Sequence, residues 1–231
     1  MKLLNRVLCA VALVLVSAPV WAGRLQVSPT SFSVAQNAQT TAKELWVSNT
    51  SSTPLSAQIR VMRWTQANFS DEWTPTTEVL PSPAMIQIAP NTQQLVRVII
   101  PKPLGADEKT YRVIVDELPG EEQQSTTAQV NFLLRYSIPF FVNPDWSSPR
   151  LTARVEQNGG EWFVVVQNPT AHTIKATNLY SQTNGKQTVL TAGLVGYVLP
   201  NAQMRWPLPG PVTGQLMVTL NDKTEPTSLA L

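Results

Sequence analysis

The residue types that do chemistry in enzymes are few in this sequence, and their spacing keeps them apart. His172 is the only histidine, so a serine hydrolase would depend on it as its base, and no Gly-x-Ser-x-Gly motif accompanies it. We expect a structural histidine that bonds its own loop. Asp116 and Glu117 are adjacent, and neighbours on a strand face opposite sides, so they do not form a glycosidase pair. The sequence therefore predicts no enzyme, no metal site and no cofactor.

The first 22 residues are expected to be a secretory signal peptide. Lys2 and Arg6 precede an apolar run over 7–16, and the small residue Ala22 suits cleavage. That run is far shorter than the roughly 20 residues that span a bilayer, so we expect no stable membrane insertion. The only cysteine, Cys9, lies in this segment, so the exported protein is expected to use no disulfide.

Composition indicates a neutral protein built from many short strands. Cleavage would remove two of the 17 basic residues and none of the 15 acidic ones, which leaves 15 of each. Nucleic acid is therefore not an expected partner. Nineteen prolines and ten glycines, with abundant β-branched residues, favour strands joined by turns. We expect an all-β fold with two domains, over 23–143 and 144–231, after the signal peptide at 1–22.

Alternating apolar residues between turn signals predict the strands. No convincing amphipathic helix interrupts them, which is typical of immunoglobulin-like sandwiches, here without their cysteines. A linker is expected at 143–149, and loops at 74–83, 101–107 and 119–127. The expected strands are 25–34, 41–48, 55–64, 85–89, 95–100, 111–118, 129–142, 151–156, 161–167, 173–180, 198–208, 215–220 and 227–231.

The stretch 129–142 is unusually long for a strand. Its fourteen residues would extend roughly 46 Å at about 3.3 Å per residue, and Arg135 is its only charge. An exposed strand this apolar is an aggregation hazard unless a partner pairs with it. It is therefore expected either to pass from one domain to the next or to be shared with another molecule.

Seven motifs follow one another along nearly all of the chain after residue 22. They are LQVSPTSFSV, LWVSNTSSTPLSAQIRVMRWTQ, APNTQQLVRVI, YRVIVDELP, LLRYSIPFFVNP, WFVVVQNPTAHTIKATNL and GYVLPNAQMRWPLP. Each motif is weak alone, but together they are strong. In this order they resemble the PapD-like family of periplasmic chaperones, which assemble pili with an outer-membrane usher, and within it the archaic or spore-coat-U-like branch.

The resemblance implies two immunoglobulin-like domains set in a boomerang, and a periplasmic location. It implies a chaperone that lends its long strand to pilus or fimbrial subunits, which lack their last strand, until the usher exchanges it. Carried over by position, the donor face consists of Val130, Phe132, Leu134 and Tyr136. The alternative is that this face is simply the core of the chain's own domain.

The sequence departs from the family at the cleft between the domains. Better-known members hold the subunit's terminal carboxylate with two basic residues, and Ser31 and Pro139 occupy those positions here. Arg135 or Arg112 could substitute.

The junction between the domains also departs from the family. Glu117 matches an acidic residue that the family uses at this junction, but Asn143 stands where its arginine partner is usual. The resemblance therefore leaves this ion pair open.

Two other classes remain as alternatives. A secreted adhesin or pilus subunit would show a truncated sandwich and its own N-terminal donor arm, whereas two complete domains are expected here. A carbohydrate-active enzyme would need the acid pair that is missing. We expect no small-molecule substrate.

Overall fold

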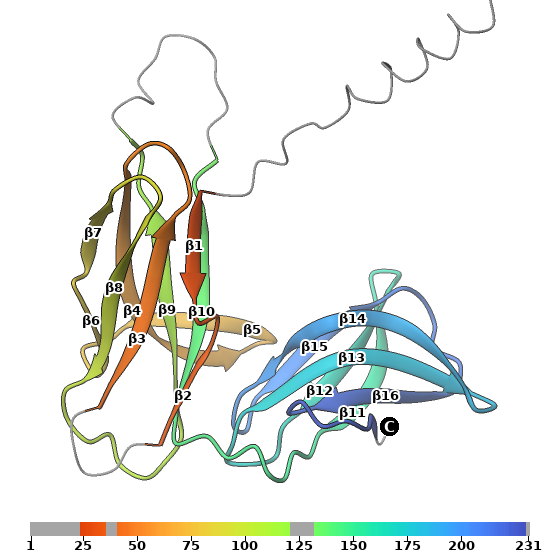
Figure 1. Ribbon diagram of the computed structural model, residues 1–231. Coiled ribbons are helices and arrows are strands. Elements are labelled where there is room, and N and C mark those ends of the chain that lie inside the picture. The colour runs from red at the N-terminus through yellow and green to blue at the C-terminus, as the bar shows by residue number, and fades with distance from the viewer. Residues whose placement is uncertain (1–23, 36–40, 121–131, 230–231) are drawn as a thin grey trace, which may run out of the picture.

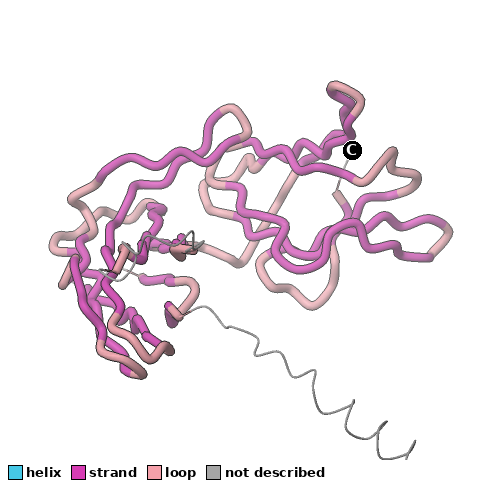
Figure 2. The backbone as a smooth tube through the Cα atoms, turned by 90° about the horizontal axis from the view of Figure 1, so that it is seen from above, coloured by secondary structure: helices cyan, strands magenta, loops and turns pink. Residues whose placement is uncertain are grey.

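The computed structural model describes residues 24–35, 41–120 and 132–229, and it confirms the expected fold class. The described chain forms two β-sandwiches set at an angle to each other (Figures 1 and 2). Figure 2 shows strands and loops and no helix in these ranges, so none is present that could cross a membrane. The expected signal peptide and Val130 lie outside the described residues.

The strands are numbered in chain order. The first sandwich contains β1 (Leu25–Ser28), β2 (Phe32–Val34), β3 (Thr41–Asn49), β4 (Leu55–Ala67), β5 (Ser70–Pro75), β6 (Leu80–Ser82), β7 (Met85–Ile88), β8 (Thr92–Ile100), β9 (Lys109–Glu117) and β10 (Arg135–Val142). The second sandwich contains β11 (Thr152–Asn158), β12 (Glu161–Gln167), β13 (Ile174–Thr183), β14 (Lys186–Val198), β15 (Gln203–Leu208), β16 (Gln215–Leu220) and β17 (Thr227–Ser228).

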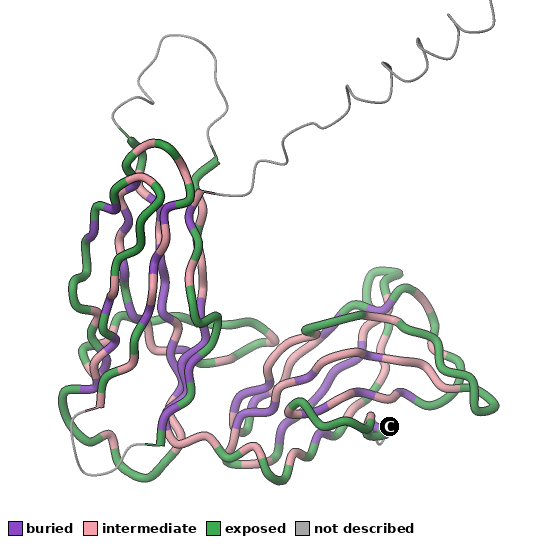
Figure 3. Tube along the Cα trace, in the orientation of Figure 1, coloured by how far each residue is buried: buried purple, intermediate pink, exposed green. Residues whose placement is uncertain are grey.

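Each sandwich packs two sheets face to face. In the first, the sheet β1-β3-β8-β6 faces the sheet β2-β10-β9-β4-β5, and β7 pairs with β4. In the second, β11-β12-β15 faces β14-β13-β16-β17. All described pairs are antiparallel except β2 with β10, which is parallel. The alternation of buried and exposed residues along β4 and β8 follows from this one-sided packing (Figure 3).

The opening segment, expected as one strand over 25–34, is two strands in different sheets. β1 pairs with β3, and β2 pairs with β10. Pro29 lies between them and has no N–H to continue a ladder, which explains why the chain leaves one sheet and enters the other here. This switch places Ser31 and Ser33 beside the end of β10.

Two further expectations for strands were wrong. The expected loop at 74–83 contains the end of β5 and all of β6. The expected strand at 198–208 is instead the end of β14, a turn at Asn201 with φ 57°, and β15.

Two residues of the first sandwich enter the hydrophobic core of the second sandwich. Trp64 of β4 and Phe141 of β10 belong to the core of the second sandwich, where both are almost fully buried. The Phe141 ring lies 5.4 Å from the ring of Tyr197 on β14 and 5.1 Å from that of Trp146. The end of β10 is therefore a structural element of both sandwiches.

Candidate functional site

β10 is paired along its whole length on one side only. Its register with β9 runs from Arg135 opposite Asp116 to Val142 opposite Lys109. On its other side, β2 covers only the last three residues, from Phe140 to Val142. Among the described residues, no strand lies beside the first five residues of β10 on that side. β10 therefore offers a free edge beside its N-terminal half.

The direction of the backbone groups along this edge follows from one hydrogen bond. The Glu117 N–H donates to the Leu134 carbonyl at 2.9 Å, so Leu134 directs its backbone groups toward β9. In an antiparallel ladder this direction alternates. The backbone groups of Arg135 and Ser137 consequently point toward the free edge. Pro139, the next residue in this series, has no N–H, which is tolerated at an edge.

The expected fourteen-residue strand is shorter in the structure. β10 begins at Arg135, and residues 132–134 are not in a strand, while 129–131 lie outside the described residues. The reason is the loss of the ladder with β9: the Leu134 N–H, which would bond the Glu117 carbonyl in a continued antiparallel pair, donates to the Glu117 carboxylate at 3.2 Å. A strand has no ladder to join beyond that point.

The expected donor residues fall into two environments. Phe132 is 83% exposed, and its neighbour Leu133, which is not one of the expected donor residues, is 44% exposed. Leu134 and Tyr136 are half-buried and pack against the core of the first sandwich, and the Tyr136 hydroxyl donates to the Leu25 carbonyl at 3.0 Å. For these two, contact with the chain's own core is thus part of their role. Phe132 is the described residue on this face that does not pack against the core of the first sandwich.

Two carboxylates fix the chain where β10 begins. Asp116 accepts hydrogen bonds from Arg135 and from Arg60, the latter at 2.5 Å. Burial raises the pKa of Asp116, but these bonds outweigh burial and hold the pKa below its usual value. Glu117, whose side chain is fully buried, pairs with Arg24 and accepts the Leu134 N–H at 3.2 Å. The path of residues 134 and 135 is thereby pinned to the end of β9.

Glu117 and Asn143 do not meet. Asp116 pairs with Arg135 at one end of the β9–β10 ladder, whereas Asn143 follows Val142 at the other end. Glu117 therefore does not lie at the junction between the sandwiches. Asn143 does, with φ 52°, and its Nδ2 donates to the Gly105 carbonyl at 2.9 Å.

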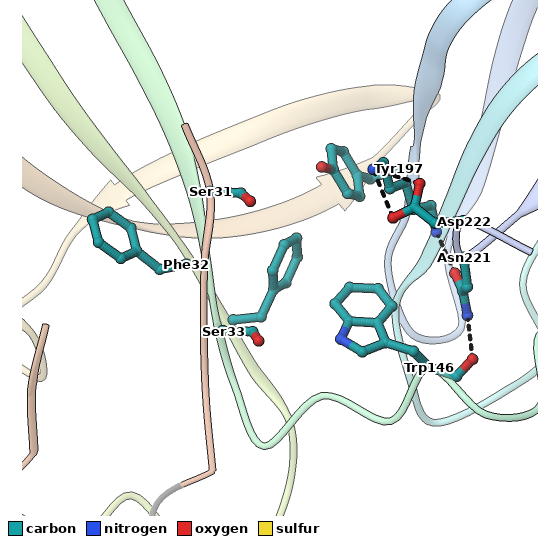
Figure 4. A pocket seen from close by; sticks show the side chains of 9 residues that line it. Ser31, Phe32, Ser33, Trp146, Tyr197, Asn221 and Asp222 are labelled. Carbon is teal, nitrogen blue, oxygen red and sulfur yellow. Dashed lines mark hydrogen bonds and ion pairs between the residues drawn. The ribbon is translucent and has the colours of Figure 1, made fainter. Parts of the chain in front are cut away.

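A cavity of about 330 Å³ lies between the sandwiches at the end of β10 (Figure 4). Ser31 and Ser33 lie on one side of it, and Trp146 and Tyr197 lie on the other, while Phe32 points away into the first core. The cavity is also lined by Phe141, Lys175, Asn221 and Asp222. This is the position at which Ser31 replaces a basic residue of the resembling family.

Lys175 is the cation that the structure places in this cavity, and sequence reasoning missed it. Its Nζ lies 2.8 and 2.9 Å from the two oxygens of Asp222, whose side chain is 68% exposed. An exposed pair of this kind contributes little to stability, so exchanging Asp222 for another carboxylate costs little. Lys175 was not predictable because the alternation along 173–180 marks it only as an outward-facing residue.

The two arginines expected at the cleft do not line the cavity. Arg135 lies five residues before Phe140, at the other end of β10. Arg112 lies next to Pro139 in register, and its guanidinium carbon is 3.7 Å from the Trp64 ring centroid. Burial lowers the pKa of Arg112, and Asp71 at 3.6 Å acts in the opposite direction. Within the described ranges, the buried Arg112 Nε has no hydrogen-bond acceptor.

The described residues contain no group of side chains able to hold a metal ion. What the geometry provides is a partly uncovered strand edge, an exposed aromatic residue leading into it, and a cleft at its far end. Strand edges and clefts of this kind bind extended polypeptide. The fold is thus a pair of immunoglobulin-like sandwiches, and its candidate site is an uncovered strand edge with a cleft at one end.

Comparison with known proteins identifies the family. Residues 25–147 match the model of the pili and flagellar-assembly chaperone, PapD N-terminal domain. The chain therefore belongs to the PapD-like family of pilus assembly chaperones, a class of proteins that are not enzymes, and the sequence resemblance is confirmed. No curated protein sequence matches the chain.

Solved structures with the same fold are also pilus chaperones. The CsuC–CsuE chaperone–tip adhesion subunit pre-assembly complex from archaic Csu pili of Acinetobacter baumannii matches with 23% identity and a TM-score of 0.67, covering 89% of this chain and 96% of that chain. The Salmonella enterica SafA pilin in complex with the SafB chaperone matches with 20% identity and a TM-score of 0.60, covering 90% and 96%. The E. coli chaperone DraB matches with 18% identity and a TM-score of 0.58, covering 90% and 98%.

Proposed function

We propose that this chain is a periplasmic chaperone that completes pilus subunits by lending them the segment 130–139 as a strand and then delivers them to an outer-membrane usher. The observation that carries this proposal is the free edge of β10 beside Arg135–Pro139. Backbone hydrogen bonds along such an edge supply affinity, and alternate side chains supply specificity. The chaperone–subunit complexes among the similar structures support the same mode.

The organisation of the chain fits this role. We propose a signal peptide over 1–22, which takes the protein to the periplasm, and domains over 23–143 and 144–231. The absence of a described strand between Val142 and Thr152 supports this division. The alternative of a secreted adhesin or pilus subunit has no support in the family to which the chain belongs.

Among the described donor residues, Phe132 is the one whose side chain a bound subunit would newly bury. Burying one such residue contributes on the order of 1.5–3 kcal/mol, and the entropy of association offsets part of this. Val130, on the same face, is proposed to act with Phe132. Leu134 and Tyr136 contribute less new burial because they already contact the first core.

Substitution of Phe132 by aspartate tests the donor face. A charge placed in an apolar groove costs several kcal/mol, enough to abolish a micromolar complex worth about 8 kcal/mol. We expect Phe132→Asp to melt like wild type, because the side chain is 83% exposed, and to lose co-purification of a subunit co-expressed from the neighbouring reading frame.

Leu133→Asp is the matched control, because in the paired strand that we propose for the complex the next residue faces the opposite side. It should retain most of the subunit. Equal subunit recovery with Phe132→Asp and wild type would rule out this donor face, and unfolding of Phe132→Asp would assign the residue to the chaperone's own core.

We also propose where the subunit's terminal carboxylate is held. Ser31 and Pro139 provide no cation, and a buried carboxylate without one is costly. Lys175 lines the cleft cavity and Arg112 lies behind Tyr197, 5.9 Å from its ring. Arg135, at the far end of β10, remains the alternative derived from the sequence.

Alanine variants separate these candidates. We expect Lys175→Ala to lower the yield of the chaperone–subunit complex about tenfold, and Arg154→Ala, an exposed arginine on β11, to leave it unchanged. Arg135→Ala is measured alongside. A loss of yield with Arg135→Ala and none with Lys175→Ala would move the anchor from the cleft to the start of β10.

A further inference from the structure

β14 is a long edge strand that neither proline nor, after its first residue, charge protects. It is the outermost strand of the sheet β14-β13-β16-β17 and runs from Lys186 to Val198. After Lys186 it carries no charged residue. Soluble proteins protect edge strands with charges, prolines, bulges or short length, because bare edges recruit other chains. On β14 only a bulge serves this purpose, and a bulge leaves apolar side chains on the strand available to a partner.

Apart from the free edge of β10, the other edges of the described sheets carry charges or are short. β5 carries Asp71 and Glu72, β11 carries Arg154 and Glu156, and β15 carries Arg205 and Pro207. The remaining edge strands have at most four residues each, and they are β1, β2, β6, β7 and β17. A long edge strand with almost no charge is thus particular to β14 and is not general in this chain.

Apolar side chains on β14 and its neighbours form a patch on the outer face of this sheet. Val189 and Leu194 are each 57% exposed, whereas Leu190 and Val195 turn inward against the core. Val189 lies opposite Tyr180 on β13, which in turn lies opposite Met217 on β16. Tyr180 and Met217 are half-buried and lie outside the core cluster. We call Val189, Leu194, Tyr180 and Met217 the β14 patch.

A bulge decides how this patch can bind. The Gly193 N–H is taken by Asn178 Oδ1 at 2.8 Å, and Gly193 has φ 75°. The ladder with β13 shifts register on both sides of this point. A bulge interrupts regular strand pairing and bends the edge. Contact through apolar side chains is therefore favoured over the addition of a further strand.

The patch is continuous with the cleft at the end of β10. Lys175 lines the cleft cavity, and Thr177, the next residue on the same face of β13, lies opposite Leu194. Tyr197, at the inner end of β14, lines the same cavity and contacts the Phe141 ring. Figure 1 shows β14 on the inner side of the angle between the two sandwiches. A protein held on β10 would therefore extend over the patch.

We propose that the β14 patch is a second docking surface for the pilus subunit, in which apolar side chains of the subunit body cover Val189 and Leu194. This inference rests on the proposed function. The continuity with the β10 cleft selects the subunit as occupant, and the absence of charge along β14 selects an apolar surface on it. The second sandwich would then help to hold the unfinished subunit, beyond its part in the cleft.

Leu194→Asp tests the patch, with Met85→Asp as the matched control. Met85 is 55% exposed on β7 of the first sandwich, away from the cleft. The affinity of each purified variant for the co-expressed subunit is measured by calorimetry or by competition. We expect Leu194→Asp to weaken binding about tenfold or more and Met85→Asp to change it less than about twofold. Val189→Thr with Leu194→Thr, which keeps strand-forming residues, should weaken binding in the same direction.

The outcomes distinguish this inference from the proposed function. If the Leu194→Asp protein binds like Met85→Asp while Phe132→Asp loses binding, the patch is wrong and the donor strand stands. If Phe132→Asp also binds normally, both proposals fall. If the free chaperone is a dimer that Leu194→Asp converts to a monomer without affecting subunit affinity, the patch belongs to a second copy, which overturns the inference. Should Leu194→Asp lower the melting temperature, the variant with both Val189→Thr and Leu194→Thr is used in its place: weaker subunit binding supports the patch, and unchanged binding overturns it.

Discussion

Two asparagines, Asn49 and Asn168, hold the same turn in the two sandwiches. They are 1% and 0% exposed. Each Nδ2 donates to the carbonyl four residues later at 2.7 Å and to two carbonyls of a distant segment, and each Oδ1 accepts the N–H and hydroxyl two residues later. The sequence predicted turns at both places. The sequence did not show that Asn-x-Ser at Asn49 and Asn-x-Thr at Asn168 form the same hydrogen-bonded turn, because each asparagine also bonds carbonyls of a distant segment.

Replacement of Asn168 by alanine is predicted to be strongly destabilising. Three carbonyls lose their donor, two of them at the buried turn after β14, and each buried unsatisfied group costs about 1–3 kcal/mol. We expect a loss of about 2–4 kcal/mol, seen as a lower midpoint in urea unfolding. Asn158→Ala, at the exposed end of β11, should change the free energy of unfolding by less than about 0.5 kcal/mol. Equal midpoints for the two variants would contradict this account of the turn.

At the scale of the element, the sequence predicted strands wherever one face meets a core. β3, β4, β8 and β16 largely alternate apolar and polar residues, β12 is a continuous apolar run, and the structure has all five near the expected positions. β5 escaped prediction because all six of its residues are exposed, so no alternation marks it. β14 escaped because the bulge at Gly193 breaks its period and because few of its side chains enter the core.

The start of β10 and the cleft were beyond sequence reasoning for a different reason. Whether residues 132–134 form a strand depends on where β9 ends, which is not encoded in those residues themselves. The donor face was inferred from the family, and the exposure of Phe132 is consistent with it. Lys175 became a candidate only when folding brought β13 to the cleft beside Ser31.

Hydrogen exchange is predicted to show the free edge directly. The amides of Arg135 and Ser137 point away from β9, so in the free chaperone they should exchange faster than those of Tyr136 and Ile138, which donate toward β9. Binding of a subunit strand should slow the first pair by an order of magnitude or more and leave the second pair nearly unchanged. Amide-resolved exchange by nuclear magnetic resonance measures both. Unchanged exchange at Arg135 and Ser137 in the complex would mean that the subunit strand does not pair with β10.

At the scale of the whole molecule, the side chains of Gln66 and Glu108 join the two sandwiches by polar contacts. Gln66, near the end of β4, donates to the Tyr197 carbonyl at 3.0 Å and accepts the Leu199 N–H at 2.8 Å. Glu108, just before β9, has a side chain only 1% exposed and accepts the Thr173 N–H at 3.0 Å and the Thr173 hydroxyl. The ring of His172, which we expected to bond its own loop, instead lies 3.3 Å from Glu108 through Nδ1.

Glu108→Ala is predicted to loosen this junction. Thr173 is fully buried, so its N–H and hydroxyl would be left without an acceptor, at a cost of about 2–4 kcal/mol for two unsatisfied groups. Opening the junction would let water reach these groups, so the variant should sample a wider range of angles between the sandwiches. The cleft that Ser31 and Lys175 share would then vary in width, and we expect weaker subunit binding without any change at β10.

Distance measurement between labels on the two sandwiches tests this prediction. The only cysteine, Cys9, lies in the expected signal peptide, so cysteines introduced for the exposed residues Gln93 and Lys186 accept spin labels selectively. We expect a broader distribution of label distances in Glu108→Ala than in wild type. Glu72→Ala, which removes an exposed carboxylate from β5, should leave the distribution unchanged. Equal widths for all three proteins would show that the aromatic contacts around Phe141 hold the angle without Glu108, and the junction would have to be assigned to them alone.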